Sequence, residues 1–149
     1  MTGTDFPDRA LTLWQPWAWL VMHGFKPIEN RPKSVTYSSF RGPIWIHSGL
    51  HFDEERYDMA AALLRRIHPY ARMPARSRFL DYPRGVILGR VNVIGVLPPG
   101  GSKMDWHFED HYGFILRDVV KLAQPVKCRG YQGIWTVPSA TLEELRKAA

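Results

Sequence analysis

Three charged side chains fall within six positions of the segment GFKPIENR, residues 24–31. Lys26, Glu29 and Arg31 have the side chains of an acid–base centre or of a charged receptor. A lysine base must be neutral near pH 7, which requires desolvation or a nearby cation, and a neighbouring Glu29 favours the charged ammonium instead. Two neighbouring cations in turn keep Glu29 ionised, so it accepts protons poorly. The composition of the segment therefore favours binding over catalysis.

As a receptor, the segment offers both signs of charge. Lys26 and Arg31 are suited to phosphate or a base carbonyl, while Glu29 orients them or accepts from an exocyclic amine. In an extended chain Glu29 and Arg31 share a face, about 7 Å apart at the backbone. Lys26 joins them only if the chain bends, which Gly24 and Pro27 make feasible. The alternative is an exposed turn whose ion pair contributes about 0–1 kcal/mol.

Four polar or aromatic residues lie at the ends of neighbouring predicted elements. Trp14 is either a core residue or a platform on which a base stacks, and Gln15 beside it is able to read a base edge. His47 and Ser48 end a predicted strand, where a barrel presents functional groups. His47 is alternatively a hydrogen-bonded structural residue, and Ser48 is a nucleophile only with a base beside it. We include all four among the candidate nucleic-acid-binding residues.

A basic segment, HPYARMPARSRFLDYPR at residues 68–84, lacks apolar periodicity and is predicted to be a loop. Arg72, Arg76 and Arg78 are its candidates for contacts with phosphates beside a cleft. Such contacts supply affinity without reading sequence. The alternative is a solvated loop with no ligand.

Two histidine pairs have the spacing H-x-x-x-H, which aligns two metal ligands when it lies on a helix. The pair His47 and His51 spans a strand end and a glycine. The pair His107 and His111, in DWHFEDHYG, fits one helical turn capped by Asp105. A metallonuclease is an alternative here, but no third ligand is indicated, so we predict no metal and no cofactor.

Length and composition limit the class of protein. The 149 residues have the usual size of one domain, and the formal net charge is +6, which favours polyanionic partners. Cys128 is the only cysteine, so no internal disulfide is possible. The sequence shows no secretory signal and no apolar run of about 18 residues. We therefore expect a cytoplasmic protein with no membrane partner.

Hydrophobic patterning predicts an α+β fold. Apolar stripes and capping residues indicate helices, whereas alternating or β-branched runs indicate strands, and Gly89 and Gly95 would let the longest strand bend. A small, closed, mixed β-barrel of about five to six strands with helices packed around it accounts for this order. Strands are predicted at 11–14, 44–48, 85–97, 112–116, 119–122 and 133–137, and helices at 16–23, 53–67 and 141–147.

The segment LTLWQPWAWLVMHGFKPIENR resembles the opening of ASCH domains, a family of PUA-like barrels. Gly24, Lys26, Glu29 and Arg31 match its pattern G-x-K-x-x-E-x-R. The similarity continues in FRGPIWIHSG, HYGFILRDVVKLAQPV and RGYQGIWTV, so it covers residues 11–138 of one domain that we place at 1–149. The resemblance implies a barrel with a cleft lined by the G-x-K-x-x-E-x-R segment, and recognition of nucleic acids or nucleotides.

The resemblance also implies possible activities. Some ASCH members are similar to small amidohydrolases that act on acylated cytidine, and others are reported as ribonucleases. In the amidohydrolase type a threonine nucleophile follows the lysine by three positions. Lys26 matches that lysine, but Glu29 stands in the place of the threonine, which departs from the pattern.

We therefore predict that the protein binds RNA, another nucleic acid or a nucleotide through a basic cleft centred on Lys26, Glu29 and Arg31. One alternative is a hydrolase on the same cleft, either an N4-acylcytidine amidohydrolase or a ribonuclease, with Lys26 and Glu29 as catalytic residues. A second alternative is an adaptor that binds another protein.

Overall fold

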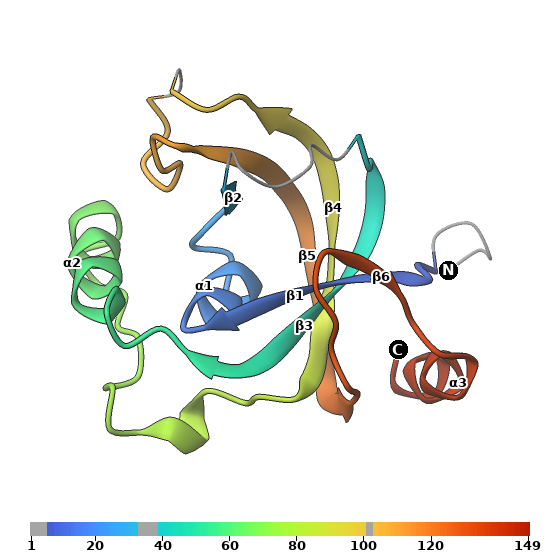
Figure 1. Ribbon diagram of the computed structural model, residues 1–149. Helices are drawn as coiled ribbons and strands as arrows, with labels where there is room; N and C mark the ends of the chain where they lie inside the picture. Colours follow the sequence, from blue (N-terminus) through green and yellow to red (C-terminus); the bar gives the residue numbers. More distant parts are fainter. Residues whose placement is uncertain (1–5, 33–38, 101–102) are drawn as a thin grey trace.

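Six strands and three helices make up the part of the chain that the computed structural model describes, residues 6–32, 39–100 and 103–149 (Figure 1). The α+β class and the number of strands are confirmed. The strands are β1 (Arg9–Gln15), β2 (Ile28–Pro32), β3 (Gly42–Phe52), β4 (Val86–Leu97), β5 (His111–Lys127) and β6 (Ile134–Thr136), and the helices are α1 (Trp17–Met22), α2 (Tyr57–Ile67) and α3 (Ser139–Ala148), with a short 3-10 helix at Phe79–Asp81.

The strands form one mixed sheet in the order β2-β5-β4-β3-β1-β6. Strand β1 runs parallel to β3, and the other pairs are antiparallel. Figure 1 shows β3, β4 and β5 curving together around α1. In the described residues the two edges, β2 and β6, do not pair with each other. The predicted closed barrel is therefore an open, strongly curved sheet.

The curvature follows from irregularities in β4 and β5. The β4–β5 register shifts between Ile87 and Gly89 and again between Val93 and Gly95, the two glycines expected to permit bending. An extra residue on one strand bends it and increases its twist. At Gly89 the backbones approach so closely that a Cβ would lie 2.3 Å from the Val120 carbonyl oxygen.

Strand β5 is one long strand where the sequence predicts two. The predicted break coincides with Asp118, which has a positive φ of 58°. Pairing with β4 continues on both sides of it, at Arg117 opposite Asn92 and at Val120 opposite Arg90. Asn92 Nδ2 donates to Asp118 Oδ2 over 2.9 Å. The local signal was thus correct, but the ladder on either side holds the strand together.

Helix α1 fills the concave side of the sheet and contacts β1, β3, β4 and β5. It begins after Pro16, and Gly24 follows it with a φ of 78°, as expected of a residue that ends a helix. Trp17 is buried, as predicted. The backbone N–H groups of Phe25 and Lys26 both point back to the Leu20 carbonyl. This turn sends the chain directly from α1 into β2.

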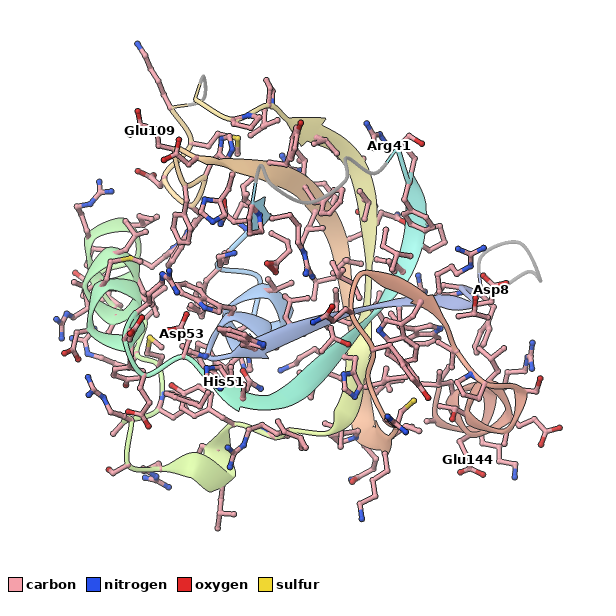
Figure 2. All side chains as sticks on the ribbon, viewed as in Figure 1. Asp8, Arg41, His51, Asp53, Glu109 and Glu144 are labelled. Atoms are coloured by element: carbon pink, nitrogen blue, oxygen red, sulfur yellow. The ribbon has the colours of Figure 1, made fainter. Side chains whose placement is uncertain are left out.

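Helix α2 begins four residues later than predicted because Asp53 holds a turn ahead of it. Asp53 accepts from the Arg56 backbone N–H over 3.2 Å and from Trp17 Nε1 over 3.0 Å. Figure 2 shows Asp53 between α1 and α2. Helix α3 packs on β5, on the side of the molecule opposite to α2 (Figure 1). Of the described helices, none is both long and apolar enough to cross a bilayer.

The close approach at Gly89 generates a stability prediction. We expect Gly89→Ala to lower the free energy of unfolding by about 1–3 kcal/mol, because the added methyl group meets backbone on β5 that cannot move independently. Guanidinium denaturation measures the change. Gly95→Ala on the same strand is the control, since its Cβ would meet only the flexible end of Ile115 at 3.3 Å. Equal losses in the two variants would contradict this account of the bend.

Candidate functional site

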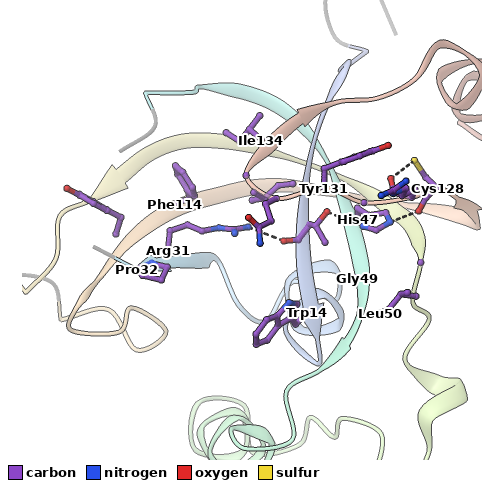
Figure 3. Close-up of a pocket in the computed structure, with 18 of the residues that line it drawn as sticks. Trp14, Arg31, Pro32, His47, Gly49, Leu50, Phe114, Cys128, Tyr131 and Ile134 are labelled. Atoms are coloured by element: carbon purple, nitrogen blue, oxygen red, sulfur yellow. Dashed lines mark hydrogen bonds between the residues drawn. The ribbon is translucent and has the colours of Figure 1, made fainter. Parts of the chain in front are cut away.

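A cavity of about 1190 Å³ occupies the seam between the two unpaired edges of the sheet. One side is formed by Arg31 and Pro32 of β2, and the opposite side by Leu11 and Thr12 of β1 together with Ile134 of β6. Residues 128–133, which link β5 to β6, complete the wall. Figure 3 shows this arrangement. The site therefore exists because the sheet stops short of closing.

The lining is largely apolar, and it contains aromatic and cationic side chains. No aspartate or glutamate is among the described residues that line the cavity. Guanidinium and ammonium groups bind phosphate, and aromatic rings stack on bases. Its cations are Arg31, Lys127 and Arg129, and its aromatic residues are Trp14, Tyr112, Phe114 and Tyr131.

Arg31 crosses the seam. Strand β6 pairs with β1 only as far as Leu11, and the carbonyl of Thr12, one residue further, accepts from Arg31 Nη2 over 3.1 Å. A hydrogen bond to a charged donor contributes about 1.5–3 kcal/mol. A side chain thus joins β2 to β1 where strand pairing does not.

Glu29 points to the same side of β2 as Arg31, as the extended path predicted, but does not line the cavity. It is 9% exposed. Glu29 Oε2 and Arg31 Nε are both buried, and neither has a hydrogen-bond partner among the described residues. Buried polar atoms are nearly always paired. This face of β2 therefore holds one acceptor and one donor that the described residues do not satisfy.

Lys26 departs from the predicted cluster. It lies apart from the cavity lining and is 2% exposed, with Nζ donating to the Ile28 carbonyl and lying 5.3 Å from the Trp17 ring centre. Burial lowers the pKa of Lys26, the Glu29 charge opposes the shift, and Arg31 adds to it. Glu29 thus favours the charged ammonium, as the sequence predicts, but desolvation is the larger effect on the pKa of Lys26.

Trp14 lies at the rim of the cavity and is 48% exposed. Its ring is held edge-on by the His51 imidazole, with ring centres 4.1 Å apart. Leu50, next along β3, is also exposed and lines the cavity. Of the two roles open to Trp14 in the sequence, the structure places it at the surface rather than in the core.

Gln15 and Ser48 are not available to a ligand. Both are fully buried and neither lines the cavity. Gln15 Nε2 donates to the Pro83 carbonyl over 2.9 Å and its Oε1 accepts from the Trp19 backbone N–H over 2.9 Å. Ser48 Oγ donates to the same Pro83 carbonyl over 2.5 Å. These side chains hold the chain at Pro83, and Gln15 also holds the start of α1.

The basic 68–84 loop does not border the cavity, contrary to the prediction. None of Arg72, Arg76 and Arg78 lines it. Arg76 pairs with Asp58 at 2.5 Å, and Arg78 with Asp81 at 2.7 Å. Arg72 donates to carbonyls of its own loop. The prediction counted cations without the carboxylates that pair with two of them, Asp81 in the loop itself and Asp58 on α2.

The histidine pairs do not assemble a metal site. Among the described residues, no group of three or more His, Cys, Asp or Glu side chains is placed to hold a metal ion. The predicted helical turn after Asp105 is an irregular loop in which Asp105 pairs with Arg66 at 3.0 Å. His107 Nε2 bonds to the His111 carbonyl over 2.7 Å. The other pair is divided, since His47 is buried and His51 is exposed.

Three of the ten predicted binding residues line the cavity: Trp14, Arg31 and His47. Sequence reasoning missed Lys127, Arg129 and Tyr131. The signal available for them was KCRGYQG, in which two cations at and just after the end of a strand precede an aromatic residue that lies between glycines. Only the fold shows that this segment returns to the seam.

Fold and site together define a curved-sheet α+β protein with a basic, aromatic-lined cavity. A family model of the ASCH domain matches residues 11–133, and the chain belongs to the ASCH domain family. The family prediction from the sequence is confirmed. No curated protein sequence matches the chain.

Solved structures are similar to this chain in fold. The crystal structure of ASCH from Zymomonas mobilis has a TM-score of 0.53 at 13% identity, and the match covers 93% of each chain. A point mutant of the same protein gives a TM-score of 0.54 at 14% identity over 97% of each chain. At these identities the similarity shows the fold alone.

The burial of Lys26 generates a pH prediction. Because folding lowers its pKa below 10.5, the unfolded chain binds the proton more readily, so wild-type stability falls as pH falls below that value. Lys26→Met lacks this titration. We expect the free energy of unfolding of the variant, relative to wild type, to rise as pH goes from 10 to 7, by up to about 1.4 kcal/mol for each pH unit.

Denaturant unfolding at the two pH values measures this difference. Lys121→Met is the matched control, since Lys121 is exposed and its replacement should give the same offset at both values. A pH-independent offset for Lys26→Met would show that Lys26 keeps its ordinary pKa in the fold.

Proposed function

We propose that this protein binds RNA, or a nucleotide unit of it, in the seam cavity. The observation that carries the proposal is the lining itself. Its charged side chains, Arg31, Lys127 and Arg129, are all cations in the described residues, and aromatic rings stand among them. Cations bind the phosphates of a nucleic acid, and aromatic rings stack on its bases.

Two edges of the cavity offer different contacts. Arg129 is exposed, and its guanidinium lies 5.3 Å from the centre of the Tyr131 ring. Such a pair presents a cation for phosphate and a face for a base on one short segment. Trp14 is the exposed aromatic residue of the opposite rim. The ligand we propose is therefore unpaired, because rings stack on a base only when its neighbour is displaced.

The inner end of the cavity supports recognition of a base edge. Arg31 lines it with Nε unpartnered among the described residues, and Glu29 Oε2 on the same face of β2 is likewise unpartnered. The Arg31 guanidinium lines the cavity and is a donor that can complement an acceptor on the edge of a base. We therefore assign Arg31 to recognition of the base and the rim to affinity.

The hydrolase alternative has less support. Burial lowers the pKa of Lys26, as a lysine base requires. Lys26 is nevertheless outside the lining of the cavity and bonded to a carbonyl, so a substrate held there does not reach it. Turnover of N4-acetylcytidine that is abolished by Lys26→Met would favour this alternative. An adaptor would bind no nucleic acid.

Phosphate contacts give the first test. Arg129→Gln should weaken binding of a single-stranded RNA and reduce the slope of log K against log salt by about 1, since one counterion contact is lost. Fluorescence anisotropy over a salt series measures both. Arg72→Gln removes the same charge from the loop outside the cavity and should change neither. Equal effects of the two variants would mean that net charge, and not the cavity, attracts RNA.

Stacking gives the second test. We expect Trp14→Ala to weaken RNA binding by about 5- to 150-fold, the range found when a base loses its aromatic partner. Trp14→Phe keeps a face and should recover much of the loss at an unchanged salt slope. The same anisotropy assay reports both variants. Unaltered affinity in Trp14→Ala would remove the rim from the binding site.

A further inference from the structure

Residues 128–133 carry Arg129 and Tyr131 to the cavity but have no regular structure of their own. The β4–β5 ladder ends at Lys127, and pairing between β6 and β1 resumes only at Ile134. This 128–133 segment therefore depends on individual contacts to stay in place.

The buried imidazole of His47 makes the central contact. His47 Nε2 lies 2.6 Å from the Cys128 carbonyl oxygen. A carbonyl only accepts, so Nε2 carries the proton and donates. His47 Nδ1 lies 3.2 Å from Thr12 Oγ1, which accepts from Trp135 Nε1 over 3.0 Å. The Thr12 hydroxyl then donates to Nδ1. Every polar atom in this series of hydrogen bonds, from Trp135 to the Cys128 carbonyl, is therefore satisfied when the imidazole is neutral.

Gly130 lets the backbone of the segment pack directly against the His47 imidazole. A Cβ at Gly130 would lie 2.4 Å from His47 Cε1, 2.6 Å from Nδ1 and 2.9 Å from Thr12 Oγ1. The backbone thus rests directly on the imidazole, and any larger residue would displace it. His47 fixes the segment at two points, by hydrogen bonding at Cys128 and by packing at Gly130.

We propose that His47 is a positioning residue: its neutral imidazole holds the 128–133 segment against the sheet and so places Arg129 and Tyr131 for the ligand. The statement about the ligand rests on the proposed function, whereas the statement about the segment does not. Figure 3 shows His47 between Tyr131 and Cys128.

Protonation would disturb this arrangement. A proton on Nδ1 leaves the Thr12 hydroxyl without its acceptor. Burial lowers the pKa of His47, and the bond to the Cys128 carbonyl opposes the shift, so the neutral form persists below the usual 6.5. The titratable groups on the segment and on the residue before it are Lys127, the Cys128 thiol, Arg129 and Tyr131. The residues beside His47 on the neighbouring strands have no titratable side chain: Thr12, Trp135 and Ile87.

Hydrogen–deuterium exchange of the unliganded protein tests the positioning. We expect amides of the segment to exchange about three- to tenfold faster in His47→Ala, the range for loss of one hydrogen bond. His47→Gln keeps a donor for the Cys128 carbonyl and should exchange like wild type. Unchanged exchange in the rest of the sheet shows that each variant is folded. The proposal would be overturned if the segment amides exchanged at the wild-type rate in His47→Ala, or if they exchanged as fast in His47→Gln as in His47→Ala.

Two further measurements separate positioning from general stability. Below pH 6.5, segment exchange in wild type, corrected for the intrinsic rate, should rise relative to His47→Gln, because only wild type can gain the disruptive proton. Gly130→Ala should speed exchange in wild type and add much less in the His47→Ala background, where the ring it meets is absent. Independent, additive effects would contradict direct contact as the cause.

RNA binding completes the experiment. His47→Ala should weaken affinity for the single-stranded RNA about as much as it loosens the segment, and His47→Gln should restore it. Wild-type affinity should fall on acidification, opposite to the gain expected from added positive charge. If wild type binds no RNA, the proposed function fails while the exchange results still decide the role of His47. RNA binding that is unaffected by a loosened segment would instead remove Arg129 and Tyr131 from the site.

Discussion

One side-chain hydrogen bond spans the only place where the described sheet fails to close, from Arg31 on β2 to the carbonyl of Thr12 on β1. Backbone pairing there would have filled the seam with a strand ladder. A long side chain instead holds the edges at a distance and leaves about 1190 Å³ between them. The same guanidinium keeps Nε for another partner. Arg31 therefore joins β2 to β1 and also lines the cavity between the edges.

Buried polar groups around the seam fall into two kinds. Gln15, Ser48 and His47 have their hydrogen bonds completed by the protein, and they fix turns and segments. Glu29 Oε2 and Arg31 Nε remain incomplete among the described residues. Desolvation without a partner is costly. This contrast separates the polar groups that the fold satisfies from two that it leaves without a partner, a distinction that residue type alone does not make.

Local signals in the sequence predicted the elements well. Pro16 and Gly24 bounded α1, and the glycines of β4 marked its bends, because these residues act through backbone geometry. The site was predicted less well. Of the predicted residues, Trp14, Arg31 and His47 line the cavity, but Lys26 is buried against Trp17, and Arg76 and Arg78 of the 68–84 loop pair with Asp58 and Asp81. Arg78 and Asp81 are only three residues apart, but the burial of Lys26 and the pairing of Arg76 with Asp58 depend on long-range packing. The 128–133 segment was missed for the same reason.

Strand β6 joins the sheet through only three residue pairs, whereas the opposite edge of the seam is held by five pairs between β2 and β5. Local opening begins where the fewest backbone bonds must break. Local fluctuations are therefore expected to widen the cavity from its β6 side. A large ligand would then enter by the same movement that begins partial unfolding.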